Sequence, residues 1–84
     1  MNVNTKDIEQ SLEEIFGEIL DISQKESINS ATMLEMTKWD SLAQVLIISA
    51  IEARFNLKIS AKDFADITSF KAAHIFVTEK LSHD

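Results

Sequence analysis

The sequence of 84 residues contains no cysteine, no proline and a single glycine. The lack of cysteine excludes disulfides, cysteine metal sites and a thiol nucleophile, and it allows a reducing compartment. The scarcity of proline and glycine argues against a turn-rich all-β fold. The longest unbroken apolar run is residues 45–48, and residues 1–7 show no apolar run after a basic start. We therefore expect neither a transmembrane helix nor a signal peptide.

Basic residues are also few, with 8 lysines and arginines against 14 acids, for a net charge of −6. Such a surface repels nucleic acid and anionic membranes and attracts basic partner patches. The alternative interpretation is that the charge only keeps a small protein soluble. We expect one domain over residues 1–84 with a small core, a monomer without nucleic-acid partners or membrane insertion.

What is present is helical periodicity. Residues 5 to about 22 predict a first helix, capped by Asn4 or Thr5. Its apolar side chains recur every three or four residues and form one stripe: Ile8, Leu12, Ile15, Phe16, Ile19 and Leu20. Gly17 interrupts this helix at a cost of about 1 kcal/mol relative to alanine.

Residues 23–38 predict a long connection without clean periodicity, of a length that is uncommon unless it serves a function. Apolar side chains that could anchor it to the core are Ile28, Met33, Leu34, Met36 and Trp39. We expect Trp39 to pack as a lid on the core, with substrate stacking as the alternative interpretation.

Residues 41–55 predict a second helix with two apolar faces. At about 100° per residue, one face carries Ile47, Ile48, Ile51 and Phe55, and the opposite face carries Leu42, Val45, Leu46 and Ser49. We assign the first set to the core. Leu42, Val45 and Leu46 of the second set then lie wholly or partly in water and form a docking surface, because one helix face cannot bury both sets. The alternative interpretation is a helix that is buried all round.

Two further helices complete the chain. Residues 61–66 predict a short third helix, started by a capping-box spacing of Ser60 and Asp63, with Phe64 and Ala65 turned to the core. Thr68 or Ser69 caps a fourth helix to about residue 81, whose stripe consists of Phe70, Ala73, His74, Val77 and Leu81. The prediction is an all-α four-helix bundle of the up-down type, with a short third helix and a long loop between helices one and two.

A chemically distinctive junction lies where the long connection meets the second helix, at Lys38-Trp39-Asp40-Ser41-Leu42. Backbone N–H groups of a first helical turn lack partners and favour a nearby negative charge. A phosphate ester on Ser41 would be stabilised there. The plainer interpretation is that Asp40 or Ser41 caps the helix, since both residue types are favoured at that position.

The triplet Asp40-Ser41-Leu42 after Trp39, followed by an apolar helix that ends in residues 52–55 (Glu-Ala-Arg-Phe), resembles the acyl carrier protein family. The resemblance extends from about residue 8 to residue 81. It implies that Ser41 bears 4′-phosphopantetheine, attached covalently from coenzyme A by a phosphopantetheinyl transferase that holds Mg²⁺. The arm's thiol would then carry acyl groups, in the cytoplasm, between acyl-loading and acyl-using enzymes of fatty acid, polyketide or related secondary pathways.

The resemblance also assigns partner contacts. Asp40 matches an acid that contacts the transferase, Leu42 and Val45 match docking positions beside Leu46, and Glu52 matches an acidic position late in the helix. Many fatty-acid carriers have further acids where this chain has Ala43, Leu46, Ala53 and Arg54. The departure favours a specialised carrier whose partners have apolar docking patches in addition to basic ones.

Catalytic chemistry finds little support in the sequence. His74 and His83 are the only histidines. A catalytic triad of Ser41, His74 and Asp40 would need His74 near Ser41, and nothing in the sequence places it there. We expect no catalytic residue, no metal site and no enzymatic activity. The alternatives are an aminoacyl or peptidyl carrier, an unmodified helical interaction module that binds through residues 42, 45 and 46, and a serine hydrolase, which would turn over simple esters.

Overall fold

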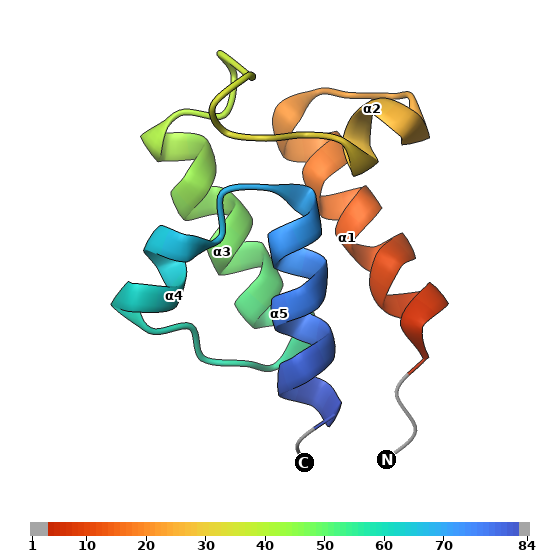
Figure 1. Cartoon of the computed structure of the whole chain (residues 1–84), viewed down its shortest axis with the longest axis vertical. Helices are drawn as coiled ribbons and strands as arrows, with labels where there is room; N and C mark the ends of the chain where they lie inside the picture. Colours follow the sequence, from red (N-terminus) through yellow and green to blue (C-terminus); the bar gives the residue numbers. More distant parts are fainter. Residues whose placement is uncertain (1–3, 83–84) are drawn as a thin grey trace.

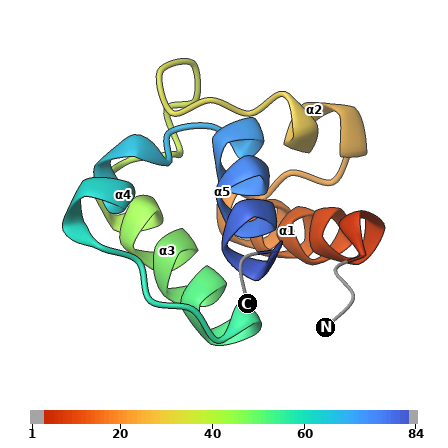
Figure 2. The ribbon, with the colours of Figure 1, turned by 60° about the horizontal axis from the view of Figure 1, so that its bottom comes forward.

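The computed structural model describes residues 4–82, and over this range the chain forms α-helices and no strand (Figure 1). The helices are α1 (Thr5–Leu20), α2 (Lys25–Asn29), α3 (Ser41–Phe55), α4 (Ala61–Asp66) and α5 (Phe70–Ser82). The three long helices pack around one core, with α1 against both α3 and α5 (Figure 2). The predicted all-helical bundle is confirmed. None of these helices combines the length and the apolar character that a membrane crossing requires.

Helix α1 begins and ends at polar residues that satisfy its terminal backbone groups. Asn4 is the N-cap, and its Oδ1 accepts hydrogen bonds from the N–H groups of Lys6 (3.0 Å) and Asp7 (3.4 Å). Asp21 ends the helix in the left-handed region, at φ 58°, two residues earlier than the sequence predicted. The predicted apolar stripe is confirmed, because its side chains are buried except for Ile19, which is partly buried.

Gly17 lies in the last turn of α1 and faces the segment that follows this helix. A Cβ atom there would lie 2.9 Å from the carbonyl oxygen of Ile22 and 3.0 Å from Cδ1 of Ile28. We expect Gly17→Ala to lower the free energy of unfolding by about 1–2 kcal/mol, because overpacking against backbone outweighs the better helix propensity of alanine. Urea denaturation measures this, with Gln10→Ala on the exposed face of α1 as control. A gain in stability would show that the turn relaxes without cost.

The connection between α1 and α3 differs from the prediction, because it contains the short helix α2. Five residues with one buried side chain, Ile28, are too few to produce a periodic signal. Leu34 was predicted to be an anchor and is not, since it is 96% exposed at the tip of a turn. The connection is instead held to the start of α5 by backbone hydrogen bonds, from Met33 N–H to the Thr68 carbonyl (2.9 Å) and from Phe70 N–H to the Ala31 carbonyl (3.0 Å).

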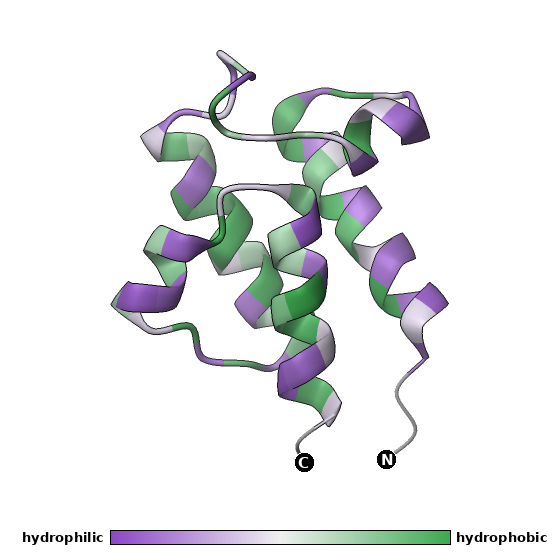
Figure 3. Cartoon of the chain, in the orientation of Figure 1, coloured by the Kyte–Doolittle hydropathy of each residue, from purple (hydrophilic) through white to green (hydrophobic). Residues whose placement is uncertain are grey.

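Helix α3 has the predicted bounds and the two predicted faces. Ile47, Ile48 and Ile51 are buried and Phe55 is partly buried. The opposite face keeps its apolar side chains in water, with Leu42 68% exposed and Val45 and Leu46 each 48% exposed. Figure 3 shows the result: apolar colour covers much of α3, whereas α1 alternates between polar and apolar turns.

Helix α4 also has its predicted bounds, and the predicted N-cap at Ser60 is confirmed. The Ser60 hydroxyl accepts from the Asp63 N–H (3.1 Å) and donates to the Asp63 carboxylate (3.0 Å). The prediction that Ala65 is buried is wrong, because α4 has no fully buried residue and only Phe64 packs partly against the core. On its outer face a hydrogen bond and ion pair with Asp66 raise the pKa of the exposed Lys62, with a smaller contribution from Asp63.

Helix α5 and the aromatic cluster close the core. Ser69 caps α5, its Oγ accepting from the Ala72 N–H at 2.9 Å. Three members of the predicted stripe are buried, and His74 and Leu81 are partly buried. Phe16 lies edge-on to both Trp39 and Phe70, with ring centroids 5.2 Å apart in each pair. Trp39 is 2% exposed, so its predicted packing on the core is confirmed.

Candidate functional site

The site forms at the N-terminus of α3, where Asp40 and Ser41 have separate tasks. Asp40 is the N-cap: its Oδ1 accepts from the Ala43 N–H at 2.9 Å, and its carbonyl accepts from the Gln44 N–H at 2.9 Å. Ser41 is the first helical residue and is exposed. Its hydroxyl has no hydrogen bond within the described part of the chain. The choice that the sequence left open is thereby resolved, and the Ser41 oxygen is available to solvent.

The electrostatics of this end of α3 suit an anionic group. The first turn of the helix contains no acidic side chain, so the positive end of the helix dipole is offset only by the Asp40 cap. One oxygen of Asp40 is already engaged by the Ala43 N–H. An exposed hydroxyl at a helix N-terminus therefore fits a phosphodiester, whose charge would lie beside first-turn N–H groups.

The structure brings most of the predicted partner-binding residues together around Ser41. Asp40, Leu42, Val45 and Leu46 lie at the cap or within the first two turns of α3, and the three apolar residues are exposed. Glu52 lies apart, roughly 16 Å farther along the helix at 1.5 Å per residue. Its Oε2 accepts from the Ile59 N–H at 2.9 Å, so this carboxylate supports the link between α3 and α4.

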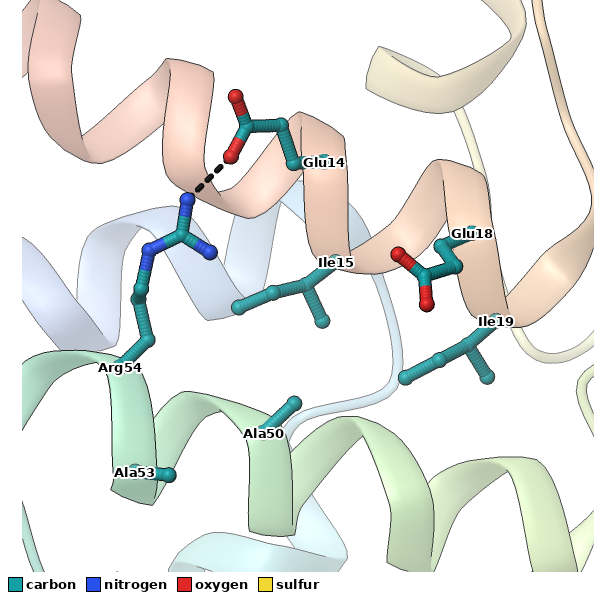
Figure 4. A pocket seen from close by; sticks show the side chains of 7 residues that line it. All are labelled: Glu14, Ile15, Glu18, Ile19, Ala50, Ala53 and Arg54. Atoms are coloured by element: carbon teal, nitrogen blue, oxygen red, sulfur yellow. Dashed lines mark hydrogen bonds and ion pairs between the residues drawn. The ribbon is translucent and has the colours of Figure 1, made fainter.

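Figure 4 shows a groove between α1 and α3, and Ser41 is not among the residues that line it. It encloses about 510 Å³ between Ile15 and Ile19 on one side and Ala50 and Ala53 on the other. Arg54 of α3 forms an ion pair across it with Glu14 of α1, and Glu18 completes the rim. Arg54, the basic residue late in α3, therefore connects α3 to α1.

The Ser41 hydroxyl and His74 are not brought together. His74 stacks on Phe70, with ring centroids 6.4 Å apart, in a depression lined by Glu9, Asn29 and Lys71. Ser41 does not line that depression. His83 lies outside the described residues. Within residues 4–82 no group of three or more potential metal ligands is found.

Sequence reasoning missed Gln44. Its side chain is 3% exposed and fully hydrogen-bonded: Oε1 accepts from the Trp39 indole N–H at 2.7 Å, and Nε2 donates to the carbonyls of Phe64 and Ile67, each at 2.8 Å. A signal was present, because at 100° per residue Gln44 falls within the core face of Ile47, Ile48 and Ile51. A polar residue on a core stripe predicts a buried hydrogen-bond network.

Comparison with known proteins identifies the family. Residues 10–73, which include Ser41, match the family described as "phosphopantetheine attachment site". Acyl carrier proteins from the Tuc7, APS and 5A strains of Buchnera aphidicola subsp. Acyrthosiphon pisum are each 32% identical over 75 residues, which cover 89% of this chain and 94% of each relative. The chain belongs to the acyl carrier protein family. Members of this family carry covalently attached 4′-phosphopantetheine, and they interact with phosphopantetheinyl transferases and acyl-handling enzymes.

Proposed function

We propose that the protein carries thioester-bound acyl groups on a phosphopantetheine arm attached to Ser41. The observation that supports this most directly is at the start of α3, where Asp40 caps the helix and the Ser41 hydroxyl is left exposed. In the attachment step, Ser41 Oγ loses its proton and bonds to the phosphorus that carries the pantetheine in coenzyme A. The pyrophosphate P–O bond breaks, and adenosine 3′,5′-bisphosphate leaves.

The protein's part in the chemistry is to present the arm, and partner enzymes make and break the acyl bonds. The chain has no cysteine, so the thiol that forms the thioester comes entirely with the arm. The family assignment supports a carrier without catalytic activity, and His74 stacks on Phe70 in a depression that Ser41 does not line. A cytoplasmic location and a monomeric state are part of the same proposal.

The exposed face of α3, defined by Leu42, Val45 and Leu46, is the proposed docking surface, with Asp40 at its edge. Its character is apolar, because Glu52 is the only acid of α3 and already accepts a hydrogen bond from the Ile59 N–H. Partners are expected to recognise these side chains mainly by burying them, with Asp40 and Glu52 offering weaker contacts to basic patches. This supports a specialised carrier within the family.

The attachment itself can be tested by mass. Incubation with coenzyme A, Mg²⁺ and a broad-specificity phosphopantetheinyl transferase should increase the intact mass by one phosphopantetheine group. The reaction without transferase is the control. A protein that stays unmodified under conditions in which a known carrier is fully converted would contradict the proposal.

The docking surface predicts a separate kinetic effect. In the double variant Leu42→Ser/Leu46→Ser, two exposed apolar contacts are lost, and each is expected to contribute at least about 1 kcal/mol to association. The kcat/KM of arm transfer should therefore fall by roughly 10–100-fold. Ile75→Ser is the matched control, because Ile75 of α5 is 49% exposed, as Leu46 is 48% exposed. Equal effects of the two changes would show that α3 is not the docking face.

The same exposed strip would also suit an unmodified interaction module, and a carrier could load aminoacyl or peptidyl groups. The intact mass of protein purified from its native cells separates these alternatives. An unmodified chain there would favour the interaction module, and the mass added beyond the arm reports the class of cargo.

A further inference from the structure

We infer that Trp39 and Gln44 are positioning residues that fix the backbone of Ser41, and so the place of its hydroxyl, for arm transfer. The inference rests on the proposed attachment at Ser41. It concerns how residues 39–44, called the attachment turn below, are held in place, which neither the family match nor the relatives address.

A side-chain hydrogen bond closes the attachment turn into a ring. The Trp39 indole N–H donates to Gln44 Oε1 at 2.7 Å, between residues that lie on either side of Ser41. Inside the ring, Asp40 Oδ1 accepts from the Ala43 N–H at 2.9 Å. The six residues 39–44 are thus joined at their ends and braced in the middle, so the backbone of Ser41 has few alternative conformations.

Both ends of this ring are fixed to the core. Trp39 is 2% exposed, stands edge-on to Phe16, and its backbone N–H donates to the Met36 carbonyl at 3.0 Å. Gln44 is 3% exposed on the buried face of α3. A buried network in which every polar group is satisfied is rigid and specifies one arrangement. The core therefore determines the position of the Ser41 Cα atom, and the hydroxyl moves only by rotation of the side chain.

The other end of the Gln44 amide reaches the C-terminal end of α4. Its Nε2 donates to the carbonyls of Phe64 and Ile67, both at 2.8 Å, where the helix can no longer supply N–H partners. The amide orientation follows from this chemistry, because a flipped amide would point its oxygen at two carbonyls and its N–H groups at the indole N–H. Gln44 is the element that couples the position of α4 to the attachment turn.

The consequence concerns the rate of arm transfer more than docking. The transferase must place the Ser41 oxygen in line with the phosphorus of coenzyme A, and small misplacements of a reacting group reduce rates strongly. The docking surface of Leu42, Val45 and Leu46 lies on the opposite side of α3 from the Gln44 amide and is unchanged by its loss. Loosening the ring should therefore lower kcat and leave KM nearly constant.

Two variants test this with the whole 84-residue chain and the transferase. Trp39→Phe keeps an aromatic ring in the core but removes the indole N–H together with part of the buried side-chain volume, so it opens the hydrogen-bonded ring and leaves the bonds to Phe64 and Ile67. Gln44→Met is similar in shape and removes all three hydrogen bonds. Val77→Ala, in the buried part of α5, is the control for general loss of stability. All are assayed at a temperature at which each protein remains folded by circular dichroism.

We expect kcat for arm transfer to fall about tenfold or more in Trp39→Phe and at least as far in Gln44→Met, with KM within about twofold of wild type. Faster amide hydrogen exchange at Ser41 and Leu42 should accompany the loss in both variants but not in Val77→Ala. If wild type is modified at Ser41 and both variants keep the kcat of Val77→Ala, the positioning role is overturned and the attachment proposal stands. If wild type is not modified at Ser41, the attachment proposal itself fails.

Discussion

Ser41→Ala is expected to take up no phosphopantetheine while keeping the stability of the wild-type protein. Serine at a helix start often serves as the cap, and its removal then costs about 1 kcal/mol. Here Asp40 provides the cap, with Oδ1 2.9 Å from the Ala43 nitrogen, and the Ser41 side chain is exposed. Removing the hydroxyl should change the free energy of unfolding by less than about 0.5 kcal/mol.

This combination makes the result easy to interpret, because loss of modification cannot be attributed to loss of the fold. Intact mass after incubation with transferase measures the modification, and urea denaturation measures the free energy of unfolding. Ser49→Ala is the matched control, since Ser49 is also an exposed serine of α3. It should accept the arm at the wild-type rate. Modification of the Ser41→Ala protein would remove this hydroxyl from the mechanism.

Phe16→Ala is expected to be among the most destabilising single changes in the core. Phe16 is fully buried and contacts Trp39 and Phe70 edge-on at 5.2 Å between centroids. Truncating a buried phenylalanine costs about 3–5 kcal/mol, a large part of the roughly 5–15 kcal/mol that stabilises a typical domain. For a chain of this size the melting temperature should fall by roughly 12–40 °C.

Thermal unfolding followed by circular dichroism measures this effect. Phe76→Ala is the control within α5, because Phe76 is only partly buried and has Lys80 Nζ 5.6 Å from its ring centroid. Its loss should cost much less. A Phe16→Ala protein that melts close to wild type would show that the aromatic cluster is not the centre of the core.

Much of the fold follows from regular patterns in the sequence. The stripe from Ile8 to Leu20 predicts α1, and the two apolar faces of residues 41–55 predict both the burial of Ile51 and the exposure of Leu42. The Ser60–Asp63 spacing predicts the start of α4. These predictions succeed because each depends on local periodicity or on a cap within four residues.

The failures involve contacts between distant parts of the chain. Helix α2 is too short to show a period, and Leu34 is exposed because the turn that holds it is fixed by backbone hydrogen bonds to residues near α5. Gln44 lies on the predicted core face, which indicates burial, but the sequence could not indicate its partners at Phe64 and Ile67, which lie 20 and 23 residues away. At the candidate site, the exposure of Ser41 at the start of a helix could be predicted, whereas the choice of Asp40 as the cap required the structure.

The central claim is that the Ser41 oxygen carries the arm, and peptide mapping by mass spectrometry tests it most directly. The protein is modified with coenzyme A and transferase, digested, and its fragments are sequenced by fragmentation. The account predicts that the phosphopantetheine mass lies on Ser41 alone. The same mass on Ser49, or on any residue other than Ser41, would contradict it.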